Sequence, residues 1–114
     1  MGCARTTVLV YIRKDVMINI NAAVFSEAIV NHCAKYGAKV LQFSIFNLPG
    51  SLRAVVLATD ESEYMVWDSH FHPQDHENAC KGLGGGFYTK EHTTALEEYI
   101  DRINYASKRA HSKE

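Results

Sequence analysis

The chain has 114 residues, the size of a single compact domain. Twelve basic residues against thirteen acidic ones give a formal net charge of -1, which argues against binding to a nucleic-acid backbone, because that requires a concentrated basic surface. No stretch approaches the roughly 18 to 20 consecutive apolar residues of a membrane span. We therefore expect one domain over residues 1–114, without a membrane span and located in the cytoplasm.

Three cysteines, Cys3, Cys33 and Cys80, are widely spaced, and no Cys-x-x-Cys pair is present. This spacing is a poor disulfide framework, so we expect reduced thiols, as in a cytoplasmic protein. The start of the chain fits the myristoylation pattern at Gly2 and places Cys3 for palmitoylation. No polybasic stretch follows to strengthen the membrane binding of a single acyl chain, and lipidation stays an open alternative.

The first third of the chain predicts a strand and a helix. Thr6–Arg13 places Val, Val and Ile at every second position, which is typical of a strand. Lys14–Ile20 fits either an extended connection or a short strand. Asn21–Tyr36 repeats apolar residues at spacings of three and four, and Gly37 follows where a left-handed helix end belongs. We therefore predict a helix over Asn21–Tyr36.

Three strands are predicted in the middle of the chain. Lys39–Phe46 alternates apolar and polar residues, Arg53–Thr59 is apolar on both faces and is typical of an interior strand, and Glu63–Ser69 is a third strand. Leu48–Ser51 carries proline and then glycine at its centre, the pattern of a type II turn. These connections are too short for crossovers, so the three strands form an antiparallel meander.

The last third of the chain predicts a short strand and a second helix. After a glycine-rich turn over 82–86, Phe87 and Tyr88 indicate a short fourth strand. A helix capped by Thr89 runs to about Ala106, with Glu98 and Arg102 expected to pair on its solvent-exposed face. We expect residues 107–114 to form a frayed tail.

This order of elements indicates an α+β fold. Two amphipathic helices, each with one apolar stripe, need a sheet surface to cover. We therefore predict a two-layer sandwich, in which a mainly antiparallel sheet of four or five strands is covered on one face by both helices.

Residues 68–80 hold three of the six histidines, three carboxylates and a cysteine. His70 and His72 share a face of an extended chain and could bind one metal ion. The candidate ligands of this site are His70, His72, Asp75, His76 and Cys80. The segment is similar to the His-x-His-x-Asp-His motif of the metallo-β-lactamase superfamily, but it has one more residue between the second histidine and the aspartate. We therefore assign no family and keep a zinc-binding protein or small metal-dependent hydrolase as one alternative.

The glycine-rich run 82–86 and the aromatic residues near it form the second candidate site. Exposed backbone amides of such a run can wrap a phosphate, but neither phosphate-binding fingerprint is present, and a flexible turn is the favoured interpretation. The residues that could gather here as a binding surface are Trp67, Phe71, Gly84, Gly85, Phe87 and Tyr88. A nucleotide or small-ligand binder is a further alternative.

No set of side chains has catalytic spacing, so we assign no catalytic residue. The favoured hypothesis is a small non-catalytic interaction domain, of the accessory, immunity or inhibitor type. Its protein partner would bind the segment 67–88 or a sheet edge, and the domain could also associate with itself. No cofactor is expected for this function, and zinc would be required only for the metal-binding alternative.

Overall fold

The computed structural model describes the backbone of residues 14–112 and the side chains in that range except those of 14–20, 76–78 and 111–112. The predicted strand Thr6–Arg13 and the acylation pattern at Gly2 and Cys3 lie outside the described residues. The elements in chain order are α2 (Lys14–Lys35), β1 (Lys39–Leu48), β2 (Ser51–Thr59), β3 (Tyr64–Phe71), the 3-10 helix η1 (Pro73–Asn78), β4 (Cys80–Thr89) and α3 (His92–Ser112).

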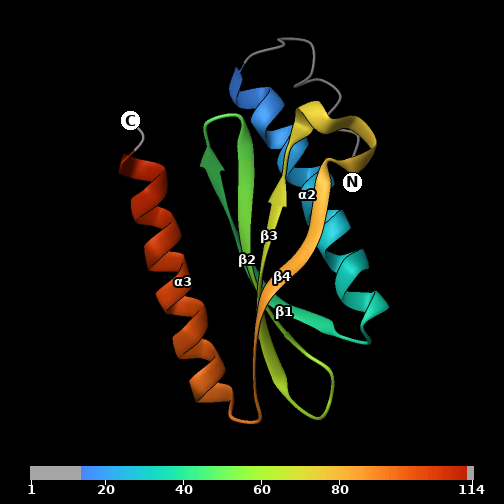
Figure 1. The fold of residues 1–114 in the computed structure, drawn as a ribbon, viewed down its shortest axis with the longest axis vertical. Coiled ribbons are helices and arrows are strands. Elements are labelled where there is room, and N and C mark those ends of the chain that lie inside the picture. The colour runs from blue at the N-terminus through green and yellow to red at the C-terminus, as the bar shows by residue number, and fades with distance from the viewer. Residues whose placement is uncertain (1–13, 113–114) are drawn as a thin grey trace.

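In the described part of the chain, four strands form one antiparallel sheet in the order β1-β2-β3-β4. Strands β2 and β3 are therefore interior, and β1 and β4 are the two edges (Figure 1). The β1–β2 hairpin turns at Pro49 and Gly50, and the φ of 75° at Gly50 is the backbone conformation that a type II turn needs at this position. The predicted antiparallel meander and the interior position of the second strand are confirmed.

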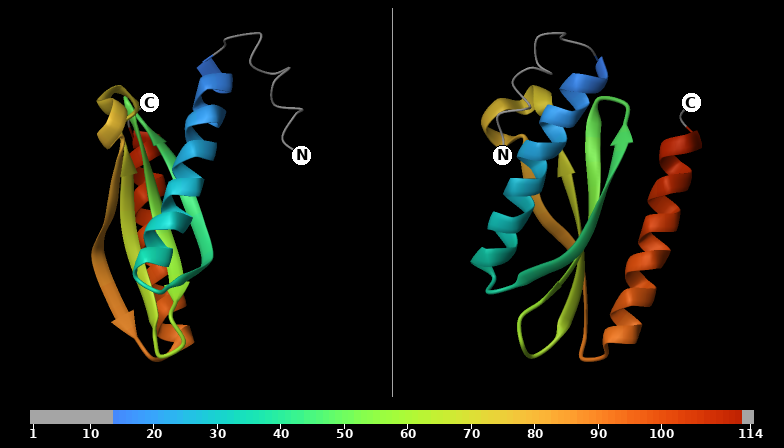
Figure 2. Two further views of the ribbon diagram at one scale, coloured as in Figure 1. Left: turned by 90° about the vertical axis from the view of Figure 1, so that its right-hand side faces the viewer. Right: turned by 180° about the vertical axis from the view of Figure 1, so that it is seen from behind.

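The two helices pack on opposite faces of the sheet (Figures 1 and 2). The core on the α2 side contains Phe25, Ile29, Cys33, Ala38, Leu52, Ala54, Val56, Ala58, Met65, Trp67 and Phe71. The core on the α3 side contains Val55, Leu57, Val66, Ala95 and Tyr99. Successive residues of β2 thus enter different cores, because side chains alternate between the faces of a strand. The α+β class is confirmed, but the expected placement of both helices on one face is wrong, and the fold has three layers.

Helix α2 begins earlier than predicted. It includes Lys14–Ile20, for which we predicted an extended connection or a short strand. The periodicity of a short apolar run does not distinguish a buried strand from a helix, and β-branched residues have only a weak preference against the helix. The other end follows the prediction, because the helix ends at Lys35 and Gly37 has a φ of 73°.

The glycine-rich segment Gly82–Gly86 lies inside strand β4 and is not a turn. Strands β3 and β4 pair with two register shifts, which fall next to Gly82 and Gly85. These two residues have φ values of 85° and 61°, the left-handed conformation that glycine provides in a bulge. The glycines therefore allow two bulges in an edge strand.

Helix α3 begins at His92, three residues after the predicted cap, because β4 continues to Thr89. The Thr89 hydroxyl accepts a hydrogen bond from the Glu91 amide (3.2 Å), just before the helix. The helix continues through residues 107–112, where we expected a frayed tail. Neither helix of the described part of the chain is long and apolar enough to cross a membrane.

Candidate functional site

The structure divides the predicted binding residues between the two faces of the sheet. Trp67 and Phe71 are 6% and 5% exposed and belong to the core under α2, whereas Phe87 packs against the core under α3. The Phe71 ring lies 5.4 Å from the Phe25 ring, centroid to centroid. Phe71 and Phe87 are therefore packing residues, and the binding surface expected from all six residues does not form as one patch.

Three aromatic rings gather on the α2 side of the sheet, and we call Tyr36, Trp67 and Tyr88 the aromatic surface. The Trp67 ring centroid lies 5.8 Å from that of Tyr36 and 6.2 Å from that of Tyr88. The indole Nε1 of Trp67 donates a hydrogen bond to the Tyr88 hydroxyl (3.0 Å). Tyr36 is 66% exposed and Tyr88 is 53% exposed, so a buried indole holds two rings that face solvent.

The glycines of β4 make room for this arrangement. A Cβ on Gly86 would collide with the hydroxyl of Tyr88 and lie 2.7 Å from two of its ring carbons. Gly84, Gly85 and Gly86 are exposed, and they leave the edge of the sheet beside Tyr88 without side chains. The sequence predicts that Trp67, Tyr88 and the glycines gather in one place, and in the structure these residues are neighbours.

Tyr36 was missed as a binding residue, because its helical spacing assigned it to the apolar stripe of the first helix. It lies just beyond Lys35, where α2 has ended, and its ring turns toward Trp67 of β3. Its place directly before Gly37 was the available signal, since side chains next to a helix end leave the regular apolar stripe.

Only some of the candidate metal ligands in the histidine-rich segment 68–80 lie close together. The rings of His70 and His72 lie side by side, with centroids 6.4 Å apart and an angle of 16° between their planes. Asp75 forms an ion pair with Lys81, and the side chain of His76 is outside the described set. Within the described residues, no three His, Cys, Asp or Glu side chains are close enough to hold a metal ion. The zinc site that includes His76 stays a prediction.

The environment of His70 favours its neutral form. Burial lowers the pKa of the His70 imidazole below its usual value, and the Arg53 guanidinium lowers it further. The carboxylate of Asp68 acts in the opposite direction, and His72 adds a smaller lowering effect. His70 is therefore a half-buried neutral group on the edge of a charged cluster.

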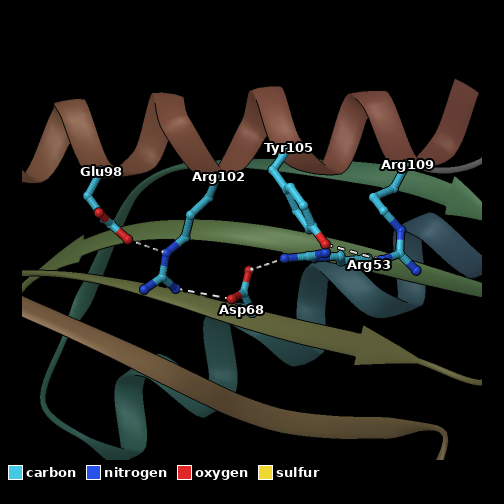
Figure 3. A network of polar contacts seen from close by, with 6 residues as sticks. All are labelled: Arg53, Asp68, Glu98, Arg102, Tyr105 and Arg109. Carbon is cyan, nitrogen blue, oxygen red and sulfur yellow. Dashed lines mark hydrogen bonds and ion pairs between the residues drawn. The ribbon is translucent and has the colours of Figure 1, made fainter. Parts of the chain in front are cut away.

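That charged cluster joins α3 to the sheet, and we call Arg53, Asp68, Glu98 and Arg102 the α3 clamp (Figure 3). Asp68 of β3 accepts hydrogen bonds from Arg53 of β2 (3.3 Å) and from Arg102 of α3 (3.1 Å). The Nε of Arg102 also pairs with Glu98 at 2.7 Å. The predicted Glu98–Arg102 pair is confirmed. However, the Arg102 side chain is only 18% exposed and points to the sheet, not to solvent.

Tyr105 extends the α3 clamp along the helix. The guanidinium carbon of Arg53 lies 5.7 Å from the Tyr105 ring centroid, and that of Arg109 lies 5.8 Å from it. Arg109 also donates a hydrogen bond to the Tyr105 hydroxyl (3.2 Å) (Figure 3). Two arginines and two carboxylates balance within the clamp itself, so its geometry fits the attachment of a helix better than the binding of a charged ligand.

No protein-family model matches this chain, and neither a curated protein nor a solved structure is similar enough to count as a match. The function must therefore follow from the geometry of the chain's own residues.

Proposed function

We propose that the protein is a non-catalytic binding module that engages a protein partner through the aromatic surface and the adjoining edge of β4. The observation that carries this proposal is the exposure of Tyr36 and Tyr88, two rings held in place by the buried Trp67. Tyrosine and tryptophan are enriched at protein interfaces and provide a large share of their binding energy. Rings that are already fixed lose little conformational entropy when a partner binds.

The edge of β4 gives the partner access to the backbone. Gly84–Gly86 have no side chains, so an extended segment of a partner can approach this edge closely. The bulge at Gly85 interrupts a regular strand ladder here, so we expect only a few backbone hydrogen bonds. Most of the contact would then come from apolar side chains of the partner on Tyr36 and Tyr88.

The other groups of residues considered as sites face inward. The α3 clamp and the core residues Phe71 and Phe87 make their contacts inside the fold. The exposed rings of the aromatic surface, in contrast, have half or more of their area free for a partner.

Photo-crosslinking tests this proposal in the cells that produce the protein. A benzophenone amino acid replaces Tyr36, Tyr88 or, as a control, Ile100, which is exposed on α3. We expect the same partner to crosslink from positions 36 and 88, and not from position 100. With that partner purified, Tyr36→Ala and Tyr88→Ala should each weaken binding about tenfold or more, as residues at the centre of an interface do.

The fold of each variant is checked by its circular dichroism spectrum and melting temperature. Equal crosslinking from all three positions would contradict the proposal. Unchanged affinity of the purified partner for Tyr36→Ala and Tyr88→Ala would contradict it as well.

A further inference from the structure

We infer that two copies of this chain associate through the outer edges of their β1 strands, so that a twofold axis joins their sheets into one. Strand β1 is an edge of the sheet, and no other strand of the described residues pairs with its outer side. The aromatic surface involves β3, β4 and the end of α2, so this interface is separate from the proposed function.

The first observation is that β1 lacks the usual edge protection from Gln42 to Leu48. Natural proteins protect sheet edges with charged side chains, prolines, bulges or very short strands. The sequence has no charged residue from Val40 to Leu52, and β1 is ten residues long. Its one register shift lies between Val40 and Gln42, and the pairing with β2 is regular from there to Leu48. The opposite edge, β4, carries two glycine bulges.

The second observation is that β1 is compatible with its own copy. A twofold axis places a strand antiparallel to itself, so any charge near the axis would face a like charge. The stretch Gln42–Leu48 has none, whichever register it adopts. A register centred on Ser44 places Phe43 opposite the partner's Ile45, an aromatic and β-branched pair of the kind that stabilises sheets. Both side chains are only partly buried against the α2-side core, so pairing would cover their remaining surface.

The competing occupant of this edge is the chain's own predicted strand, Thr6–Arg13. Helix α2 begins at Lys14, so a strand that ends at Arg13 would leave no residues for the connection from the edge of the sheet to the helix. Connections of this type usually take about 2 to 6 residues. The second copy therefore fits the edge better.

The molar mass from light scattering tests the inference, with variants that introduce positive or negative charges into β1. Gln42 and Asn47 are exposed residues of β1, so charges are tolerated there in the single chain. We expect the wild type to have twice the mass of one chain, and Gln42→Lys/Asn47→Lys and Gln42→Glu/Asn47→Glu each to be monomeric. An equimolar mixture of the two variants should recover the doubled mass, because position 42 of one strand then lies one residue from the register partner of position 47 in the other, and the two positions carry opposite charges.

The matched control is Gln74→Lys/Asn104→Lys, which adds the same charge at exposed positions outside β1. This variant should keep the doubled mass. A doubled mass that persists in both β1 variants would overturn the inference, because the chains would then associate through another surface. A monomeric wild type would overturn it too, and slow amide hydrogen exchange of its β1 residues would then show that the chain's own N-terminal segment covers the edge.

Discussion

At the scale of single residues, the β4 glycines have three different tasks. Gly82 and Gly85 adopt positive φ in bulges, and Gly86 leaves room for the Tyr88 ring. A Cβ on Gly85 would also lie 3.3 Å from a carboxylate oxygen of Asp68, in the α3 clamp. The sequence displays the glycine run plainly, but the bulges and the approach to Asp68 depend on how β4 pairs with β3.

Cys33 is a residue whose role follows from its type. It is fully buried in the core under α2, where it packs as a small apolar side chain. Burial raises the pKa of its thiol from 9.0 to about 11, because the low-dielectric core disfavours the thiolate. Cys33 is therefore a protonated core residue and a poor nucleophile.

His70 provides a prediction for the effect of pH on stability. Its pKa is lowered in the folded protein, so between the folded value and the ordinary value of 6.5 the unfolded chain binds a proton that the folded chain does not. The free energy of unfolding should therefore fall as the pH drops from 6.5 through the folded-state pKa of His70. His70→Gln should reduce this loss, measured by urea unfolding at pH 7.5 and 5.5.

Asn104→Gln, an exposed substitution without a titratable group, is the control for His70→Gln and should keep the pH dependence of the wild type. If His70→Gln and the wild type lose the same stability over this range, His70 does not titrate as described.

At the scale of elements, α3 is attached to the sheet by apolar packing and by the α3 clamp. Asp68→Asn removes the charge that neutralises Arg53 and Arg102 but keeps the shape of the side chain. Breaking a fully buried ion pair costs about 3 to 5 kcal/mol. The Asp68 side chain is 22% exposed, so its ion pairs are weaker than fully buried ones. We therefore expect Asp68→Asn to lower the free energy of unfolding by about 2 kcal/mol, measured by urea denaturation.

Asp101→Asn, at an exposed position of α3, should change the free energy of unfolding by less than about 0.5 kcal/mol. Equal effects of Asp68→Asn and Asp101→Asn would show that the clamp does not stabilise α3.

The prediction of elements succeeded where periodicity and turn signals agreed. The meander has both, since Pro49–Gly50 marks one turn and the strands beside it alternate. The helical state of Lys14–Ile20 was missed, because its short apolar run fits a strand as well as a helix. The glycine run of β4 predicts a turn by its composition, because glycine is unfavourable in a strand unless a bulge requires it.

At the scale of the whole molecule, the three-layer fold predicts that side chains on the two faces of β2 contribute equally to the free energy of unfolding. Val55 lies under α3 and Val56 under α2, and both side chains are fully buried. Val55→Ala and Val56→Ala should each lower the free energy of unfolding by about 2 kcal/mol, since each leaves a cavity in a closed core. A sheet covered on one face only would show this loss for one variant alone.

Urea unfolding followed by tryptophan fluorescence and by circular dichroism checks these values. The two probes should give one coincident transition, because both cores share the same interior strands. A Val55→Ala protein as stable as the wild type would argue against the packing of α3 on this face.

The sequence by itself determined the α+β class, the antiparallel meander and two amphipathic helices, because these follow from local periodicity and turn chemistry. Its doubly apolar strand, Arg53–Thr59, even contained the signal for cover on both faces. Only the tertiary structure decided on which face each helix packs, which aromatic rings meet and which charges pair. Those contacts join residues such as Tyr36 and Trp67, or Asp68 and Arg102, that are far apart in the chain. Local patterns do not encode such pairings, because they depend on how the layers close around the sheet.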